Sequence, residues 1–200
     1  MESLKLNSDR RQATGDMENK FQKPVACHMP HVTKIMAAYQ TKAIVLKREN
    51  IFEADRLYHL YTEDFGKVRA VAGGVRKIKA KLTGHLEPFN LIWVELMAKR
   101  GGDLFITTAL SEASLLGEGV SPGEIALFAK MSDFTLKMLK GQEKDEEMWN
   151  FILGNFIKAR EIERGADRFL NDYKNGLVKI MGFGDNFEEA VYYLGDFNVL

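Results

Sequence analysis

The sequence predicts an α+β protein in which an N-terminal five-stranded β-barrel is followed by a C-terminal α-helical domain. Between Gln40 and Ala113, short apolar stretches alternate with turn residues at the spacing of β-strands. From Ser121 onward, apolar residues recur about every three to four residues, which is the spacing of helices. With 46% hydrophobic and 28% charged residues in a chain of 200, there is enough apolar material for one large core or two small ones.

Residues 1–38 are predicted to be a disordered N-terminal extension. They are polar, show no sustained period and contain Pro24 and Pro30. Patterned sequence begins abruptly at Tyr39, so both Met1 and Met36 stay open as the start of translation.

The composition of the chain indicates a protein of a reducing compartment. Its only cysteine, Cys27, excludes an intramolecular disulfide and a cysteine-rich zinc cluster. No apolar run approaches the roughly 20 residues needed to cross a bilayer, and the N-terminus lacks the apolar core of a secretory signal. We therefore expect a cytoplasmic protein with no membrane partner.

Short strands with turns between them are predicted in the first half of the chain. The five predicted strands are residues 41–47, 56–62, 67–72, 91–98 and 104–110. In the third, alternation places Lys67 and Arg69 on one face and Val68 and Ala70 on the other, so one face of this strand is cationic. Five short strands in about 75 residues predict a small closed barrel of OB-like type, which we assign to residues 39–114.

Residues 119–200 are predicted to form the helical domain. Ser121 and Glu124 have the spacing of a capping box, and Gly141 would end the first helix. The later helices are predicted from about residue 145 to 165, from about 169 to 182, and from 187 to 194. We expect their apolar stripes to pack on one another as core.

Charge is distributed unevenly along the chain, although its 28 basic and 28 acidic residues balance overall. Residues 36–112 hold 12 basic and 9 acidic residues, whereas residues 113–200 hold 10 and 15. The most unusual stretch is residues 66–81, which contain six basic residues and no acid. A phosphodiester backbone binds such a surface regardless of sequence, because neutralised phosphates release their counterions.

Nine basic residues are therefore candidates for binding nucleic acid. They are Lys47, Arg48, Arg56, Lys67, Arg69, Arg76, Lys77, Lys79 and Lys81. The alternative is a solvated face of ordinary lysines. Tyr58 or Tyr61 could share this face as a base-stacking residue, but pattern alone does not fix the strand register.

Catalytic chemistry is not indicated by any motif. The chain has no nucleophile elbow, no phosphate-binding loop and no paired metal-ligand motif beside His59 and His85. Cys27, His28 and His31 in the N-terminal segment are one ligand short of a metal site. We predict no catalytic residue, no cofactor and no bound metal, and hence a protein that is not an enzyme.

A connected series of segments resembles the N-terminal half of the RecO family of DNA-repair and recombination mediators. The series comprises the opening strand TKAIVLKRE, the segment 53–57, the turn 61–67, and AGGVRKIKAKLTGHLEPF at 72–89. The helical half resembles the family more weakly, through the helix that ends at residues 179–183. The resemblance covers most of residues 42–183.

This resemblance implies a role in homologous recombination through the RecF pathway. A RecO-type protein is expected to bind single- and double-stranded DNA at the nucleoid, to anneal complementary strands, and to help load RecA together with RecR. The acidic, hydrophobic C-terminal tail of single-strand-binding protein is expected to contact the helical half. The family's basic barrel surface corresponds here to Arg56, Lys67, Arg69, Arg76, Lys77, Lys79 and Lys81.

The chain departs from the family pattern at one place, and two other functions stay open. Many members carry a cysteine-rich zinc module after the position of Gly182 and Phe183, and this chain lacks those cysteines, so we expect no zinc. The first alternative function is an OB-fold RNA-binding module in translation or RNA handling. The second is a non-catalytic protein adaptor whose basic strip is incidental.

Overall fold

A computed structural model describes residues 37–51, 53–75, 82–98, 104–162 and 164–184, together with Ala190 and Tyr192. Several predictions fall outside these residues. They concern nearly all of the N-terminal extension with its Cys27, His28 and His31, the basic residues Arg76, Lys77, Lys79 and Lys81, and most of the fourth helix.

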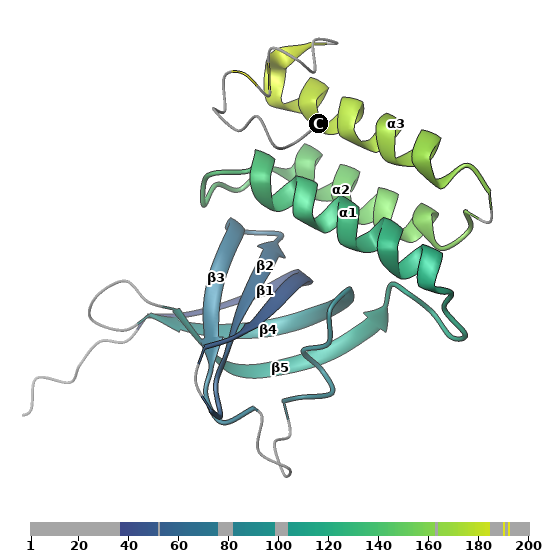
Figure 1. The fold of residues 1–200 in the computed structure, drawn as a ribbon. Coiled ribbons are helices and arrows are strands. Elements are labelled where there is room, and N and C mark those ends of the chain that lie inside the picture. Colours follow the sequence, from purple (N-terminus) through teal and green to yellow (C-terminus); the bar gives the residue numbers. More distant parts are fainter. Residues whose placement is uncertain are drawn as a thin grey trace, which may run out of the picture. The chain divides into compact units, whose positions relative to one another are not determined.

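Five strands form a sheet that closes on itself (Figure 1). They are β1 (Ala38–Asn50), β2 (Arg56–Thr62), β3 (Gly66–Ala72), β4 (Asn90–Ala98) and β5 (Leu104–Ser114). The strands pair in the order β1-β2-β3-β5-β4, and β1 pairs with β4 to close the barrel. All pairs are antiparallel except β3 with β5, which joins only Ala70 to Leu104 and Val71 to Phe105. This parallel seam is therefore the shortest in the sheet.

Strand alternation fills the interior of the barrel. The inward residues include Val45, Tyr58, Leu60, Val68 and Ala70, all at most 1% exposed. The predicted division of β3, with Val68 and Ala70 inside and Lys67 and Arg69 outside, is confirmed.

In the described part of the chain, the first three predicted helices follow the strands: α1 (Pro122–Met138), α2 (Glu146–Ala159) and α3 (Ala166–Val178). A single π-helical turn, Lys179–Phe183, continues α3. The predicted capping box is present, because Ser121 Oγ accepts from the Glu124 N–H at 3.2 Å and the Glu124 carboxylate accepts from the Ser121 N–H at 2.7 Å. No helix among the described residues is long and apolar enough to span a membrane.

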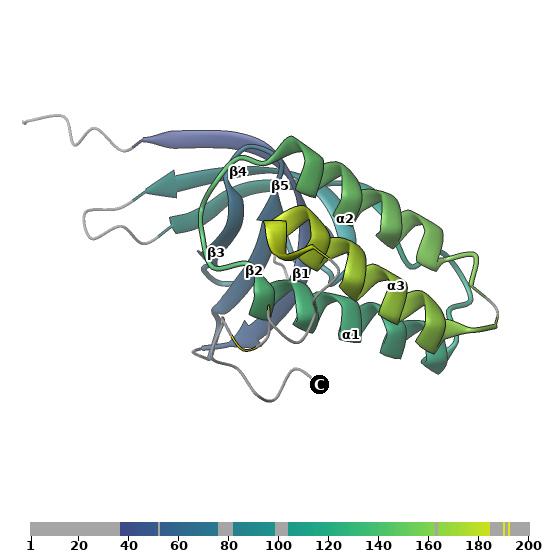
Figure 2. The ribbon, with the colours of Figure 1, turned by 90° about the horizontal axis from the view of Figure 1, so that it is seen from above.

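The helices cover part of the outer surface of the barrel, and α3 packs on α1 and α2 (Figure 2). Outward residues of the barrel, among them Ile44, Leu46 and Phe89, join the helices in one hydrophobic cluster. Phe89 lies 5.5 Å from Phe128 of α1 and 6.5 Å from Phe156 of α2, measured between ring centroids. The helices and the strands therefore share a core, and the division into domains 39–114 and 119–200 stays a prediction.

Candidate nucleic-acid interface

A basic cleft of about 760 Å³ lies between the outer face of β1, β2 and β3 and the C-terminal end of α1. Five of its lining residues are cationic, namely Lys47, Lys67, Arg69, Lys137 and Lys140. His59 also lines it, and Asp133 is the one acid in the lining. The cleft therefore combines two groups of basic residues that are far apart in the sequence.

The strand register sets three of these side chains in a row. Lys47 of β1 pairs with His59 of β2, and His59 pairs with Arg69 of β3. A register shift between Val45 and Lys47 makes Leu46 the extra residue of a β-bulge. Because strict alternation would turn Lys47 to the same side as Val45, inside the barrel, the bulge is what directs Lys47 outward into the row.

The helical wall of the cleft is held to the strands by Lys67. Its Nζ donates to the Leu136 carbonyl, in the last turn of α1, at 2.9 Å. Carbonyls at a helix C-terminus lack intrahelical donors and carry partial negative charge, so a lysine is well suited to this position. The contact fixes the end of α1, and with it Lys137 and Lys140, opposite the strand row.

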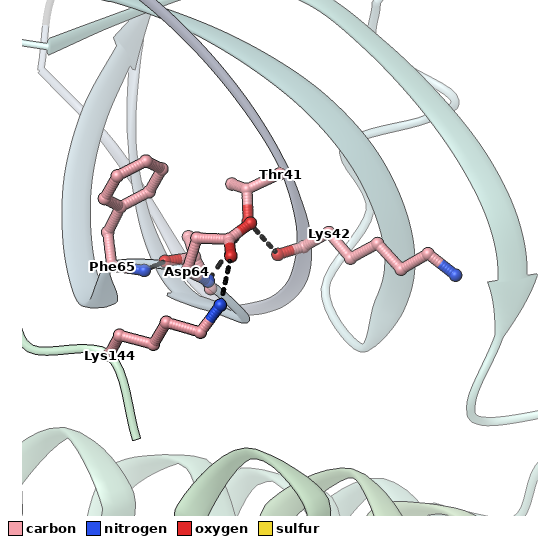
Figure 3. A network of polar contacts seen from close by, with 6 residues as sticks. Thr41, Lys42, Asp64, Phe65 and Lys144 are labelled. Carbon is pink, nitrogen blue, oxygen red and sulfur yellow. Dashed lines mark hydrogen bonds and ion pairs between the residues drawn. The ribbon is translucent and has the colours of Figure 1, made fainter. Parts of the chain in front are cut away.

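A polar clamp fixes the next segment of chain, between α1 and α2 (Figure 3). Lys144 Nζ lies 2.9 Å from Asp64 Oδ1, and Thr41 Oγ1 donates to Asp64 Oδ2 at 3.0 Å. The backbone also passes close to the β2–β3 turn, because a Cβ placed on Gly66 would lie 2.5 Å from the Glu143 carbonyl oxygen. Gly66 has φ +59°, so this tight approach requires glycine.

Positive charge is concentrated in the cleft strongly enough to affect its titratable groups. Burial lowers the pKa of Lys67, and the charges of Arg69 and Lys140 lower it further. Burial also lowers the pKa of His59, and Lys47 and Arg69 act in the same direction against the opposing effect of Glu49. A bound anion would relieve this mutual repulsion.

Arg48 and Arg56 do not line the cleft. Arg48 forms an ion pair with Glu87 at 2.5 Å, and Arg56 Nε donates to Asn50 Oδ1 at 3.1 Å. The structure thus brings together Lys47, Lys67 and Arg69 of the predicted set and leaves these two arginines elsewhere on the barrel.

The basic segment 76–81 lies outside the described residues, but the residues that flank it are described. The Gly74 N–H donates to Asp55 Oδ1 at 2.7 Å, and Thr83 Oγ1 donates to the Val75 carbonyl. The flanking residues Val75 and Thr83 are therefore in contact, and Gly74 is tied to the connection between β1 and β2.

Two tyrosines considered for base stacking are not accessible. Tyr58 points into the barrel and is fully buried, and Tyr61 is covered by the Trp149 ring at 6.0 Å. In the part of the chain that the structure describes, no group of three His, Cys, Asp or Glu side chains could hold a metal ion.

Sequence reasoning missed Lys137 and Lys140. Their helical segment contains Asp133 and reads as an ordinary charged face, so no local signal connects them with β3. Only the packing of α1 on the barrel shows that they line the same cleft as Lys67 and Arg69.

The fold and the cleft define a class: a small β-barrel with a cationic surface suited to a polyanion. Residues 36–115 match the family model described as "Recombination protein O N terminal". The match supports the RecO family over this region, as the resemblance of the sequence predicted.

Three curated relatives support this assignment. The DNA repair protein RecO of Bifidobacterium adolescentis is 42% identical over 121 residues, which are 60% of this chain and 49% of that protein. The RecO protein of Rubrobacter xylanophilus is 33% identical over 135 residues, or 67% and 52% of the two chains. That of Cutibacterium acnes is 38% identical over 69 residues, or 34% and 28%. The chain thus spans about half the length or less of these relatives.

Proposed function

We propose that this protein is a mediator of DNA repair and homologous recombination that binds single- and double-stranded DNA through the basic cleft. The observation that carries the proposal is that the row Lys47, His59 and Arg69 lines the same cleft as two lysines at and just after the end of α1, Lys137 and Lys140. The spread of cations over several strands and a helix suits a chain of phosphates. The relatives named DNA repair protein RecO favour DNA as the polymer.

We also propose that the barrel is of OB type. Its strand order, its closure through β1 and β4, and its parallel β3–β5 pair support this interpretation. OB folds bind oligonucleotides on the face of their second and third strands. The cleft lies on that face, because β2 and β3 contribute His59, Lys67 and Arg69 to its lining.

The proposed activity is annealing of complementary strands and, together with RecR, assistance in loading RecA. No reaction chemistry belongs to it, so we propose a protein without catalytic residues or cofactor. Such a role places the protein with the nucleoid in the cytoplasm. The basic residues of segment 76–81 would supply further phosphate contacts, and six contacts in all would give a log-log salt slope of roughly −4 on single strands.

A groove between α1 and α3 is our candidate for the tail of single-strand-binding protein. It has a volume of about 280 Å³ and is lined by Lys130, Asp133, Phe134, Lys137, Leu170 and Lys174. Three lysines beside an aromatic and an aliphatic side chain suit a peptide that is both acidic and hydrophobic. Lys130→Glu should weaken binding of the synthetic tail peptide, measured by fluorescence anisotropy, whereas Lys158→Glu should not.

The decisive test is annealing of complementary strands coated with single-strand-binding protein. We expect wild type to accelerate annealing and Lys47→Glu/Arg69→Glu to lose the effect. Arg76→Glu/Lys77→Glu/Lys79→Glu tests the basic segment 76–81 in the same assay. The control is Lys158→Glu/Arg168→Glu, which changes the charge equally at exposed helix positions outside the cleft.

Two results would favour the other functions. Stronger binding of single-stranded RNA than of DNA in competition would indicate an RNA-binding module. Absence of salt-dependent binding to either polymer by the folded wild type would indicate a protein adaptor.

A further inference from the structure

A second pocket, largely apolar, adjoins the basic cleft. It has a volume of about 410 Å³, which lies within the range of roughly 300–1,000 Å³ typical of small-molecule sites. Its lining residues are Tyr39, Asp64, Phe65, Val68, Leu96, Ala98, Leu104 and Gln142. Leu104 and Gln142 line the basic cleft as well, so the two hollows are neighbours.

The pocket exists because the β3–β5 seam is short. Register pairs join β5 only to Ala70 and Val71, so the first half of β3 has no partner along this edge among the described residues. Val68 and Leu96, which belong to the interior core of the barrel, therefore line the pocket. Its floor is the apolar interior of the barrel.

Two aromatic rings form the wall near the turn. Tyr39 and Phe65 have centroids 5.3 Å apart with an interplanar angle of 72°. Tyr39 remains 39% exposed, and in Figure 3 the Phe65 ring points away from the Asp64–Lys144 contact. An edge-to-face pair of this kind leaves ring surface on which a planar ligand can stack.

Polar groups are few and are placed at the rim. The Asp64 carboxylate is already engaged by Lys144 and Thr41, and these hydrogen bonds hold its pKa below the ordinary value, so it stays ionised. An anionic ligand is therefore disfavoured inside this pocket, whereas the cleft beside it favours one. The pair of hollows suits a ligand with an uncharged planar part next to an anionic part.

We propose that this pocket receives one unstacked nucleobase of a strand whose phosphates lie in the basic cleft, which adds affinity for single strands to the phosphate contacts that a duplex also makes. The inference rests on the proposed function and deepens it. A base within a duplex reaches such a pocket only by leaving its stack and its partner, at a cost of a few kcal/mol. Because stacking rather than hydrogen bonding holds the base, its identity matters little.

Three ligands of equal length test the proposal: a thymidine oligonucleotide of about 15 nucleotides, the same strand with every base replaced by an abasic site, and a mixed-sequence duplex. Phe65→Ala and Tyr39→Ala should each weaken binding of the thymidine strand by about 5- to 100-fold. Neither should change binding of the abasic strand or the duplex by more than about twofold. Phe65→Tyr should retain wild-type affinity, because it keeps the ring.

The matched control is Leu110→Ala, which truncates an apolar side chain that is 53% exposed and lies outside the pocket. Unchanged thymidine-strand binding in Phe65→Ala would overturn the proposal, and so would equal weakening on intact and abasic strands. In either case Lys47→Glu/Arg69→Glu would still weaken all three ligands if the proposed function holds. Absence of binding of all three by wild type would refute the proposed function itself.

Discussion

The outer surface of the barrel has two regions that differ in what covers them. In one, Leu46, Tyr61 and Phe89 lie under the helices and belong to the hydrophobic core. In the other, Lys47 and Arg69 lie in the open cleft. Leu46 and Lys47 are consecutive in β1, so the boundary between the regions falls at the β-bulge.

This difference shows that alternation along a strand separates inside from outside but does not identify the role of the outside. An outward residue becomes core where a helix packs on it and stays exposed where none does. The side chains follow the same division, because the covered region is aromatic and aliphatic and the open region is cationic.

The largest expected effect comes from breaking the covered region. Phe156 is fully buried and contacts the rings of Phe89, Phe128 and Tyr173. Phe156→Ala should lower the free energy of unfolding by about 3–5 kcal/mol, because it leaves a cavity. Chemical denaturation followed by far- and near-ultraviolet circular dichroism measures this change.

Both probes should lose their signal in one transition, since strands and helices share the cluster. The control is Ile157→Ala, next in the sequence but 49% exposed, which should stay within about 0.5 kcal/mol of wild type. Loss of helix signal from a barrel that stays folded would contradict the shared core.

Substitutions in the open region should weaken DNA binding and leave stability unchanged. Lys47→Glu/Arg69→Glu should weaken single-stranded DNA binding on the order of 100-fold and reduce the magnitude of the log-log salt slope by about 1.4, because two phosphate contacts are lost. Its unfolding free energy should stay close to that of wild type, since both side chains are exposed. An unchanged slope from anisotropy titrations would remove these residues from the interface.

A smaller effect is expected within the helices. Tyr173 OH and Thr135 Oγ1 are buried 2.6 Å apart, and Thr135 Oγ1 also donates to the Met131 carbonyl at 2.8 Å. Tyr173→Phe should cost about 1 kcal/mol of unfolding free energy, because Thr135 keeps its second partner. Thermal denaturation measures this loss of stability. A loss as large as that of Phe156→Ala would contradict the view that Thr135 keeps a second hydrogen-bond partner.

His59 should make DNA binding depend on pH by a few-fold. Burial, Lys47 and Arg69 lower its pKa below 6.5, against the opposing effect of Glu49, and a phosphate in the cleft would raise it again. Binding then takes up a proton, so affinity should rise as pH falls through the interval between the bound and free pKa values. His59→Gln should show a flatter profile between about pH 7.5 and 5.5; an identical profile would place His59 outside the binding site.

The smallest effect is expected at the clamp. Hydrogen bonds from Lys144 and Thr41 hold the pKa of Asp64 below its ordinary 3.8, so its contribution to stability is present above that pH and is lost as pH falls through the lower folded value. Asp64→Asn should therefore be slightly less stable than wild type at neutral pH, and the difference should vanish in acid. A stability difference between Asp64→Asn and wild type that grows as pH falls would contradict this prediction.

Local signals in the sequence were sufficient for part of the secondary structure. The predicted β2 bounds, the capping box at Ser121 and the helix start at Asp145 are confirmed, because turn chemistry and capping depend on residues close in sequence. The predicted β1 was shorter than the strand Ala38–Asn50, and its bulge was not foreseen. A bulge depends on the partner strand, which local pattern does not contain.

In the sequence, alternation alone determined which residues of β3 face outward. Charge alone made Lys67 and Arg69 candidates for binding nucleic acid. Only the tertiary structure decided that Lys137 and Lys140 join them, that Arg48 and Arg56 lie elsewhere, and that a short seam leaves an apolar pocket beside the cleft. The physical reason is range: alternation and capping act over a few residues, whereas a binding site is made by segments that packing brings together from distant parts of the chain.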